Sequence, residues 1–181
     1  YFYRWQFDQG SGQLDRYLPT GKRDLHHASP VWWLTLKRWL MRSTILLVGT
    51  RKGLVIYALE NDQWSYQNTY FEAIPVTLAY VDPRDTSWWA LLNHGHWGIK
   101  LHRSTDQGQT WERLEAPKYP EGTEVKAGEP AATKYLWGIA HGGHDRPGRI
   151  WIGTIPGGLF KSENHGRSFE LVESLWNHPS R

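Results

Sequence analysis

The stretch RSTDQGQTWERL, residues 103–114, places a hydroxyl, an acid, a glycine, a second hydroxyl and a tryptophan at fixed offsets. Where a chain reverses between two strands, Gly108 can adopt the positive φ that a Cβ atom would oppose. The Asp106 carboxylate can accept hydrogen bonds from local backbone N–H groups and from the neighbouring hydroxyls. The pattern therefore predicts a structural turn rather than a site of chemistry. Its residues are Ser104, Asp106, Gly108, Thr110 and Trp111, whose ring is expected to pack against the next strand's sheet.

A second copy of this turn lies 58 residues further along the chain, in KSENHGRSFELV, residues 161–172. The residues of the second copy are Ser162, Asn164, Gly166, Ser168 and Phe169. A third, weaker copy spans 44–67, where Tyr57 and Trp64 keep the seven-residue offset between the first hydroxyl and the aromatic residue. The acid and the glycine are absent from that copy. The chain therefore contains an internal repeat.

Short apolar runs surround each copy, and one more run precedes the two better copies, at 75–82 and 134–142. These runs are β-branched or aromatic and are bounded by turn residues, which is typical of strands. Twelve Trp, nine Tyr, 18 Gly and 10 Pro agree with short strands, many turns and aromatic packing. Four short antiparallel strands per repeat predict an all-β fold, a β-propeller.

A closed ring of six or seven such sheets needs roughly 300–350 residues. The 181 residues are therefore expected to hold two to three four-stranded sheets of a longer propeller, as an N-terminal fragment. Remaining sheets would be needed to close the fold, because strand edges and flat apolar faces would otherwise be exposed.

The turn sequences carry a family resemblance. STDQGQTW fits the Asp-box, or BNR, pattern Ser-x-Asp-x-Gly-x-Thr-Trp of sialidases and related propellers, and SENHGRSF is a degenerate copy. Residues 41–181 resemble bacterial BNR-repeat propellers described as sialidase-like or glycosyl-hydrolase-like. The resemblance implies that the box lies on the face away from the active site. The turns after each second strand and the connections after each fourth strand are then expected on the opposite, ligand-binding face.

Candidate ligand contacts follow from that orientation. They are Arg51, Lys52, Glu72, His94, His96, Trp97, Trp176, His178 and Arg181. In the long segment 115–133, Tyr119, Glu124 and Glu129 could supply a ring and a carboxylate, or the segment could be a surface excursion. Trp176 could stack on a sugar, or it could be buried between sheets.

Two functional classes follow. A sialidase-like glycoside hydrolase acting on terminal sugars needs several arginines to clamp the substrate carboxylate. The resemblance also implies a Tyr nucleophile activated by Glu and an Asp acid–base. The Phe/Tyr-Arg-Ile-Pro motif of the first family arginine is absent, and Arg51 is its nearest stand-in. That absence favours the alternative, a non-catalytic propeller that binds a glycan or a protein partner. On its own this fragment is expected to be inactive.

Composition excludes other classes. The absence of cysteine excludes disulfides and thiolate metal sites. His94 and His96 are expected on one face and His144 on the other, so the His94–His96 and His141–His144 pairs do not share a site and neither a metal site nor a cofactor is predicted. The net charge of +3 comes from residues 1–40, which hold six Lys/Arg and three Asp, leaving 15 basic and 15 acidic residues in 41–181. No nucleic-acid-binding footprint is indicated.

Residues 1–40 differ from the rest. The apolar run VWWLTLKRWL is interrupted by Lys37 and Arg38 and is too short to span a bilayer, so no membrane association is predicted. No signal peptide can be placed, and MRSTILLVGT from Met41 resembles a natural start. We expect 1–40 to lie outside the fold, the alternative being an extension with an amphipathic helix at 31–40. A cytoplasmic location is expected, with secretion as the alternative because sialidases are commonly secreted.

Overall fold

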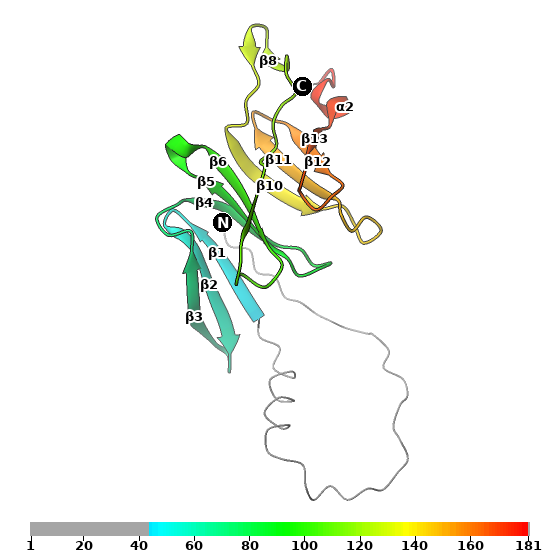
Figure 1. Cartoon of the computed structure of the whole chain (residues 1–181). Coiled ribbons are helices and arrows are strands. Elements are labelled where there is room, and N and C mark those ends of the chain that lie inside the picture. The colour runs from blue at the N-terminus through cyan, green and yellow to red at the C-terminus, as the bar shows by residue number, and fades with distance from the viewer. Residues whose placement is uncertain (1–43, 181) are drawn as a thin grey trace, which may run out of the picture.

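The computed structural model describes residues 44–180, and all of its main elements are antiparallel strands (Figure 1). The expectations for residues 1–40 and for Arg181 fall outside these residues. Three sheets follow one another along the chain and are called blades 1 to 3. This confirms the predicted fold class, an open partial β-propeller. Within residues 44–180 no helix is long and apolar enough to cross a membrane.

Each blade has its strands in chain order. Blade 1 contains β1 (Thr44–Thr50), β2 (Gly53–Glu60) and β3 (Gln63–Tyr70). Blade 2 contains β4 (Val76–Val81), β5 (Trp88–Asn93), β6 (Ile99–Ser104) and β7 (Glu112–Leu114). Blade 3 contains β10 (Tyr135–His141), β11 (Ile150–Ile155), β12 (Leu159–Ser162) and β13 (Glu170–Leu171).

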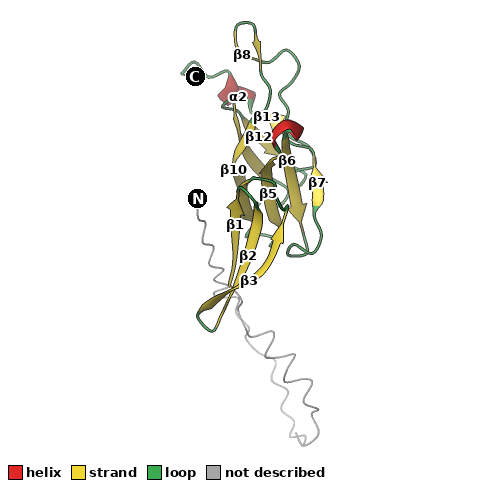
Figure 2. Cartoon of the chain, turned by 90° about the vertical axis from the view of Figure 1, so that its left-hand side faces the viewer, coloured by secondary structure: helices red, strands yellow, loops and turns green. Residues whose placement is uncertain are grey.

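Smaller elements lie between and after the blades. A hairpin of β8 (Glu124–Lys126) and β9 (Glu129–Pro130) interrupts the long connection from blade 2 to blade 3. The 3-10 turn η1 (Gly95–Trp97) joins β5 to β6, and α2 (Glu173–Trp176) follows β13. The hairpin and α2 lie at the same end of the strands (Figure 2).

Antiparallel pairing gives each blade two ends. The box end holds the Asp-box turns and comprises 61–62, 83–87, 105–111, 142–149 and 163–169. The connector end holds the connections between blades and comprises 51–52, 71–75, 94–98, 115–134, 156–158 and 172–180.

The core lies between the blades rather than within one sheet. Between blades 1 and 2 it comprises Leu54, Ile56, Val76, Trp88, Ala90 and Leu92. Between blades 2 and 3 it comprises Tyr80, Trp89, Leu91, Leu101, Leu114, Leu136, Ile150 and Ile152. Because successive side chains of a strand point to opposite faces, Trp88 faces blade 1 and Trp89 faces blade 3. The adjacent tryptophans of β5 therefore pack against the two neighbouring blades, and nearly all of β5 is buried.

Strand register defines which positions are equivalent in the blades. Trp88 pairs with Ser104 in blade 2, and Ile150 pairs with Ser162 in blade 3. Trp89 and Trp151, the next residues, are therefore equivalent.

Register also corrects one expectation about blade 1. The seven-residue offset predicted that Trp64 corresponds to Trp111, but Tyr66 is the residue that pairs with Tyr57. The reason is the tight β2–β3 turn, whose two residues Asn61 and Asp62 both have positive φ. Because β2 continues past Tyr57 to Glu60 before this turn, whereas β6 ends at Ser104, the partner of Tyr57 lies further along the chain than the seven-residue offset predicts.

Candidate functional site

The first Asp-box turn is closed by a network of hydrogen bonds around one carboxylate. Ser104 Oγ donates to Asp106 Oδ1 at 2.7 Å, and Thr110 donates its hydroxyl to Oδ2 at 2.6 Å and its N–H to Oδ1 at 2.8 Å. Gly108, with φ of 88°, donates its N–H to Ser104 Oγ at 2.8 Å. All of these hydrogen bonds to the Asp106 carboxylate come from residues of the same turn. The geometry is therefore that of a structural element.

The second turn repeats the network with an amide in place of the acid. Ser162 Oγ donates to Asn164 Oδ1 at 2.9 Å, and Asn164 Nδ2 donates to Ser168 Oγ at 2.8 Å. The N–H of Ser168 and that of Gly166 donate to Asn164 Oδ1 and Ser162 Oγ, each at 2.9 Å. The Asn164 side chain therefore bonds to the equivalent serine before it and hydroxyl residue after it, as the Asp106 carboxylate does in the first turn.

The box glycines also bring the blades together. A Cβ on Gly108 would lie 2.9 Å from the Trp88 ring, and a Cβ on Gly166 would lie 2.7 Å from the Trp89 ring. The closing aromatic residues pack nearby. Trp111 contacts the rings of Tyr70 and Phe71 in blade 1, and Phe169 packs against the core between blades 2 and 3.

We expect Asp106→Asn to preserve the turn and remove its acid sensitivity, because Asn164 makes equivalent bonds. The Thr110 hydroxyl, then the Thr110 N–H and the Ser104 hydroxyl, lower the pKa of Asp106 from 3.8 to about 2. A carboxyl with a depressed folded pKa stabilises the fold above its unfolded pKa and loses that effect as pH falls from about 4 to 2. Urea midpoints should therefore fall more steeply over this range in the wild type than in the variant. Parallel slopes would contradict the assignment.

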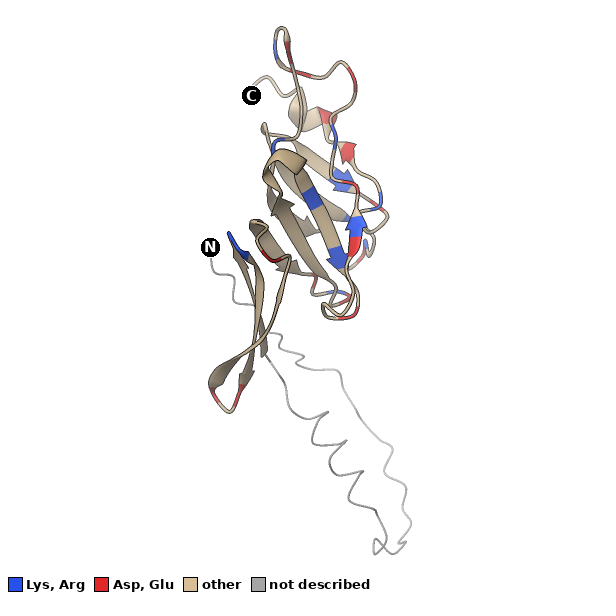
Figure 3. Ribbon diagram, turned by 60° about the vertical axis from the view of Figure 1, so that its left-hand side comes forward, with Lys and Arg blue, Asp and Glu red and all other residues tan. Residues whose placement is uncertain are grey.

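The predicted ligand contacts fall into separate groups at the connector end, one on each blade. Arg51 and Lys52 form the β1–β2 turn, and Glu72 lies beside it, since the N–H of Ala73 donates to the Lys52 carbonyl at 3.0 Å. This basic turn lies apart from the basic residues on the strands of blade 2 (Figure 3). The candidates on blade 1 therefore lie near one another and apart from the candidates on blades 2 and 3.

The blade 2 candidates lie in and beside η1. Trp97 is 71% exposed, and its ring contacts the edge of the His96 ring at 5.9 Å. His94 precedes the turn, where its N–H donates to the Gly98 carbonyl at 2.9 Å. His141, the last residue of β10, and His144, in the box-end loop 142–149, have rings 6.1 Å apart. Among residues 44–180 there is no group of three or more His, Cys, Asp or Glu able to hold a metal ion.

The blade 3 candidates differ in exposure. Trp176 is only 8% exposed and packs on the Tyr119 ring at 4.9 Å, so its ring contributes to the core rather than to an open sugar platform. His178 is exposed and lies 2.7 Å from Ser180 Oγ. Tyr119 places its hydroxyl 2.6 Å from the Pro156 carbonyl and 2.8 Å from Thr154 Oγ1. Tyr119 thereby anchors the long segment 115–133 to blade 3.

The acids of that segment form local contacts. Glu124 Oε2 accepts from the Gly128 N–H at 3.1 Å, within the β8–β9 hairpin. Glu129 forms ion pairs with Lys126 at 3.3 Å and with Lys134 at 3.9 Å. Neither the Glu124 hydrogen bond nor the Glu129 ion pairs involve Tyr119.

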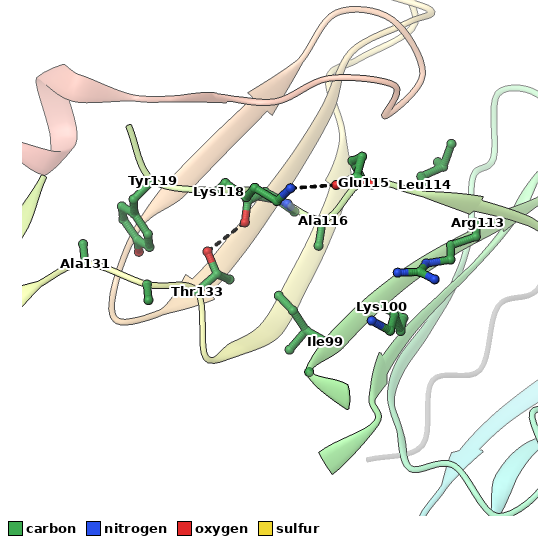
Figure 4. A pocket seen from close by; sticks show the side chains of 13 residues that line it. Ile99, Lys100, Arg113, Leu114, Glu115, Ala116, Lys118, Tyr119, Ala131 and Thr133 are labelled. Atoms are coloured by element: carbon green, nitrogen blue, oxygen red, sulfur yellow. Dashed lines mark hydrogen bonds and ion pairs between the residues drawn. The ribbon is translucent and has the colours of Figure 1, made fainter. Parts of the chain in front are cut away.

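A groove of about 600 Å³ lies between the outer strands of blade 2 and the segment 115–133 (Figure 4). Lys100 and Arg113 lie on one side of it, and Tyr119 and Thr133 lie on the other. Lys118 pairs with Glu115 at 2.8 Å along the rim. The apolar part of the lining comes from Ile99, Leu114, Ala116, Pro117, Ala131 and Ala132. Sequence reasoning missed Lys100 and Arg113, because no motif contains them and only the pairing of β6 with β7 brings them together.

His102 lies next to these cations. Burial, and then the charges of Arg113 and Lys100, lower the pKa of His102 from 6.5 to about 4. The ring packs on Phe71 at a centroid distance of 4.8 Å, and its buried Nδ1 has no hydrogen-bond partner. The imidazole is therefore neutral at neutral pH, beside a basic patch.

We expect His102→Phe to flatten the pH dependence of stability. Phe160 occupies the equivalent position in blade 3, since His102 pairs with Ala90 as Phe160 pairs with Ile152. The unfolded histidine binds a proton below about pH 6.5 while the folded one does not, so wild-type stability is lost as pH falls from 6.5 to 4. Urea midpoints at pH 7 and pH 5 should differ less in the variant.

The control for this prediction is His178→Phe, which changes an exposed histidine. It should keep the wild-type difference between the two pH values. An unchanged difference in His102→Phe would contradict the prediction.

Arginines do not gather at the connector end. Within its described turns and connections, Arg51 is the only arginine. Arg84, Arg146, Arg149 and Arg167 lie at the box end, and Arg103 at the end of β6 pairs with Asp85 of the box end at 2.7 Å. Arg84 is an unpredicted structural residue. It pairs with Asp82 at 2.6 Å, and its side chain is 6% exposed.

Comparisons with known proteins identify no family for this chain. No protein-family model matches the chain, and no curated protein matches it. Among solved structures it is similar to a chain described as YCF48 bound to D1 peptide, with 14% identity and a TM-score of 0.47. The match covers 72% of this chain and 36% of that one, so this chain spans about a third of the length of that structure.

Proposed function

We propose that this chain is a non-catalytic propeller module that binds a protein partner, and that an acidic segment of the partner occupies the groove beside blade 2. The observation that carries the non-catalytic part is the distribution of arginines. A sialidase-like hydrolase clamps its substrate carboxylate with several arginines. Toward the described connector end the chain supplies two, Arg51 in the β1–β2 turn and Arg113 on β7, and they lie on different blades. A sialidase-like hydrolase, the activity that the Asp-box resemblance implies, would therefore depend on arginines outside residues 44–180.

The charge of the groove supports an acidic ligand. Lys100, Arg113 and Lys118 face one nearby acid, Glu115, whose pKa is lowered chiefly by its hydrogen bond with Lys118. The low pKa of His102 comes in part from the same positive field. Complementary charge guides association and sets register, while apolar contacts exclude water. An extended acidic segment would place carboxylates against Lys100 and Arg113 and its apolar side chains against the groove lining.

Glycan binding is the second candidate, and the exposed Trp97 ring favours it. A ring that is 71% exposed at a turn can stack on a sugar, because it presents an apolar face with a polar edge. Among residues 44–180 its ring contact is with His96, and this T-shaped contact leaves a face of the Trp97 ring open.

The proposal is tested with a fluorescein-labelled peptide of alternating Glu and Leu, and with a Lys–Leu peptide as the opposite-charge control. Fluorescence anisotropy should show binding of the acidic peptide alone. Lys100→Glu and Arg113→Glu should each weaken it about tenfold or more. Arg167→Glu, which reverses an exposed charge at the box end, is the matched control and should leave binding unchanged.

Three results would overturn the proposal. If Arg167→Glu weakens binding as much as the groove variants do, the attraction is general charge rather than a site. Turnover of a fluorogenic sialoside by the chain would contradict the non-catalytic assignment. Binding of a glycan that is lost in Trp97→Ala, without binding of the acidic peptide, would replace the protein partner by the second candidate.

A further inference from the structure

Three basic side chains lie on one face of blade 2 at the groove. Lys100 and His102 are two residues apart on β6, so they lie on the same side of the sheet. Arg113 of β7 is directly opposite His102, and the Cβ atoms of such a pair are about 5 Å apart. Lys100 and Arg113 line the groove, whereas His102 is not part of its lining (Figure 4). A charge bound in the groove would therefore lie close to the imidazole without contacting it.

Among residues 44–180, the surroundings of His102 favour its neutral form. Burial disfavours the charged ring, and the charges that act on it, those of Arg113 and Lys100, are both positive. Its ring packs on Phe71 in the connection between blades 1 and 2, and its partner on β5 is Ala90, so neither neighbour carries a charge. The buried Nδ1 has no hydrogen-bond partner among these residues. The free chain therefore keeps His102 neutral at neutral pH.

The neighbouring acids belong to other contacts. Glu112 pairs across the strands with Arg103, so it lies on the opposite face of blade 2 from Arg113. Glu115 pairs with Lys118 at 2.8 Å on the rim of the groove. Glu72, in the connection between blades 1 and 2, is exposed. The negative charge that would favour a protonated imidazole on this face would therefore come from a ligand.

We propose that binding of an acidic segment in the groove is coupled to protonation of His102, so that the groove binds its partner more tightly at mildly acidic pH than at neutral pH. The inference rests on the proposed function, because the ligand is the same acidic segment. Carboxylates placed against Lys100 and Arg113 offset the two charges that oppose protonation, and they favour the charged imidazole directly. The complex then takes up a proton that the free chain does not hold at the same pH.

The direction and the range of the pH dependence follow from the free histidine. Its pKa is about 4 in the free chain, against an ordinary value of 6.5, and binding raises it. Protonation strengthens binding by the same factor by which binding favours protonation. Affinity should therefore increase as pH falls from about 6.5 toward 4 and should be constant above this range. Burial of the ring remains in the complex, so the expected gain is moderate, about two- to tenfold between pH 7 and pH 5.

A peptide whose own charge does not titrate tests this coupling. In a peptide of alternating cysteic acid and Leu, the sulfonates stay ionised at both pH values, so a change in affinity comes from the chain. Isothermal titration calorimetry should show the tighter binding at pH 5, and heats that differ between buffers of different ionisation enthalpy should show proton uptake. His102→Phe should lose both effects. His144→Phe, which changes an exposed histidine at the box end, is the matched control and should retain them.

The possible results separate this inference from the proposed function. Equal affinity of the wild-type chain at the two pH values would overturn the inference alone, and the acidic ligand would stand. Loss of the pH dependence in His96→Phe rather than in His102→Phe would assign it to the exposed histidine of η1 and would also overturn the inference. No binding at either pH would overturn both the inference and the proposed function. Circular dichroism should show each chain folded at both pH values.

Discussion

Arg84→Met is expected to lower the free energy of unfolding by about 3–5 kcal/mol, the usual cost of breaking a buried ion pair from one side. The Arg84 guanidinium pairs with Asp82, whose side chain is 2% exposed. It also donates to the carbonyls of Gly143 at 3.2 Å, Arg146 at 2.6 Å and Arg149 at 3.0 Å. These carbonyls belong to the box-end loop of blade 3. The variant therefore leaves a buried carboxylate uncompensated and removes every one of these bonds between blades 2 and 3.

Urea denaturation followed by far-UV circular dichroism measures this loss. Arg146→Met is the matched control, because its pair with Asp145 is long, at 3.5 Å, and both side chains are more than half exposed. Exposed pairs contribute about 0–1 kcal/mol. Adding Asp82→Asn to Arg84→Met should recover part of the loss by removing the unpaired charge while an oxygen still accepts the N–H of residue 84. Equal losses in the Arg84 and Arg146 variants would contradict the assignment.

The sequence predicted those parts of the fold that rest on local patterns. The Asp-box turns depend on residues within four positions of one another, so their hydrogen bonds could be anticipated from STDQGQTW. The strands around them follow from short apolar runs. The orientation of the turns then followed from antiparallel alternation, which correctly separated His94 and His96 from His141 and His144.

Contacts between distant segments could not be predicted in the same way. The acceptors of Arg84 lie about 60 residues further along the chain. The sequence left open whether Trp176 stacks on a ligand or is buried. The Trp176 ring is covered because segment 115–133 folds onto blade 3 and places Tyr119 against it. Lys100 and Arg113 form one patch only after β6 pairs with β7.

Trp89→Ala is expected to cost about 3–5 kcal/mol of unfolding free energy, as for other buried aromatic side chains. Trp89 is fully buried, its Nε1 donates to Ser87 Oγ at 3.1 Å, and the Arg103 guanidinium lies over its ring at 5.3 Å. Removing the ring leaves a cavity beneath the box glycine Gly166, so blade 3 loses its main contact with blade 2. Urea denaturation at a protein concentration where the chain is monomeric measures the loss.

The internal repeat supplies the control for this prediction. Trp151→Ala removes the same side chain from the equivalent position of blade 3, where no described blade covers it. It should cost less than Trp89→Ala, because Trp151 is only partly buried, with the Arg149 guanidinium 5.7 Å from its ring centre. Equal costs would contradict a core located between the blades, because a described blade packs on Trp89 and none packs on Trp151.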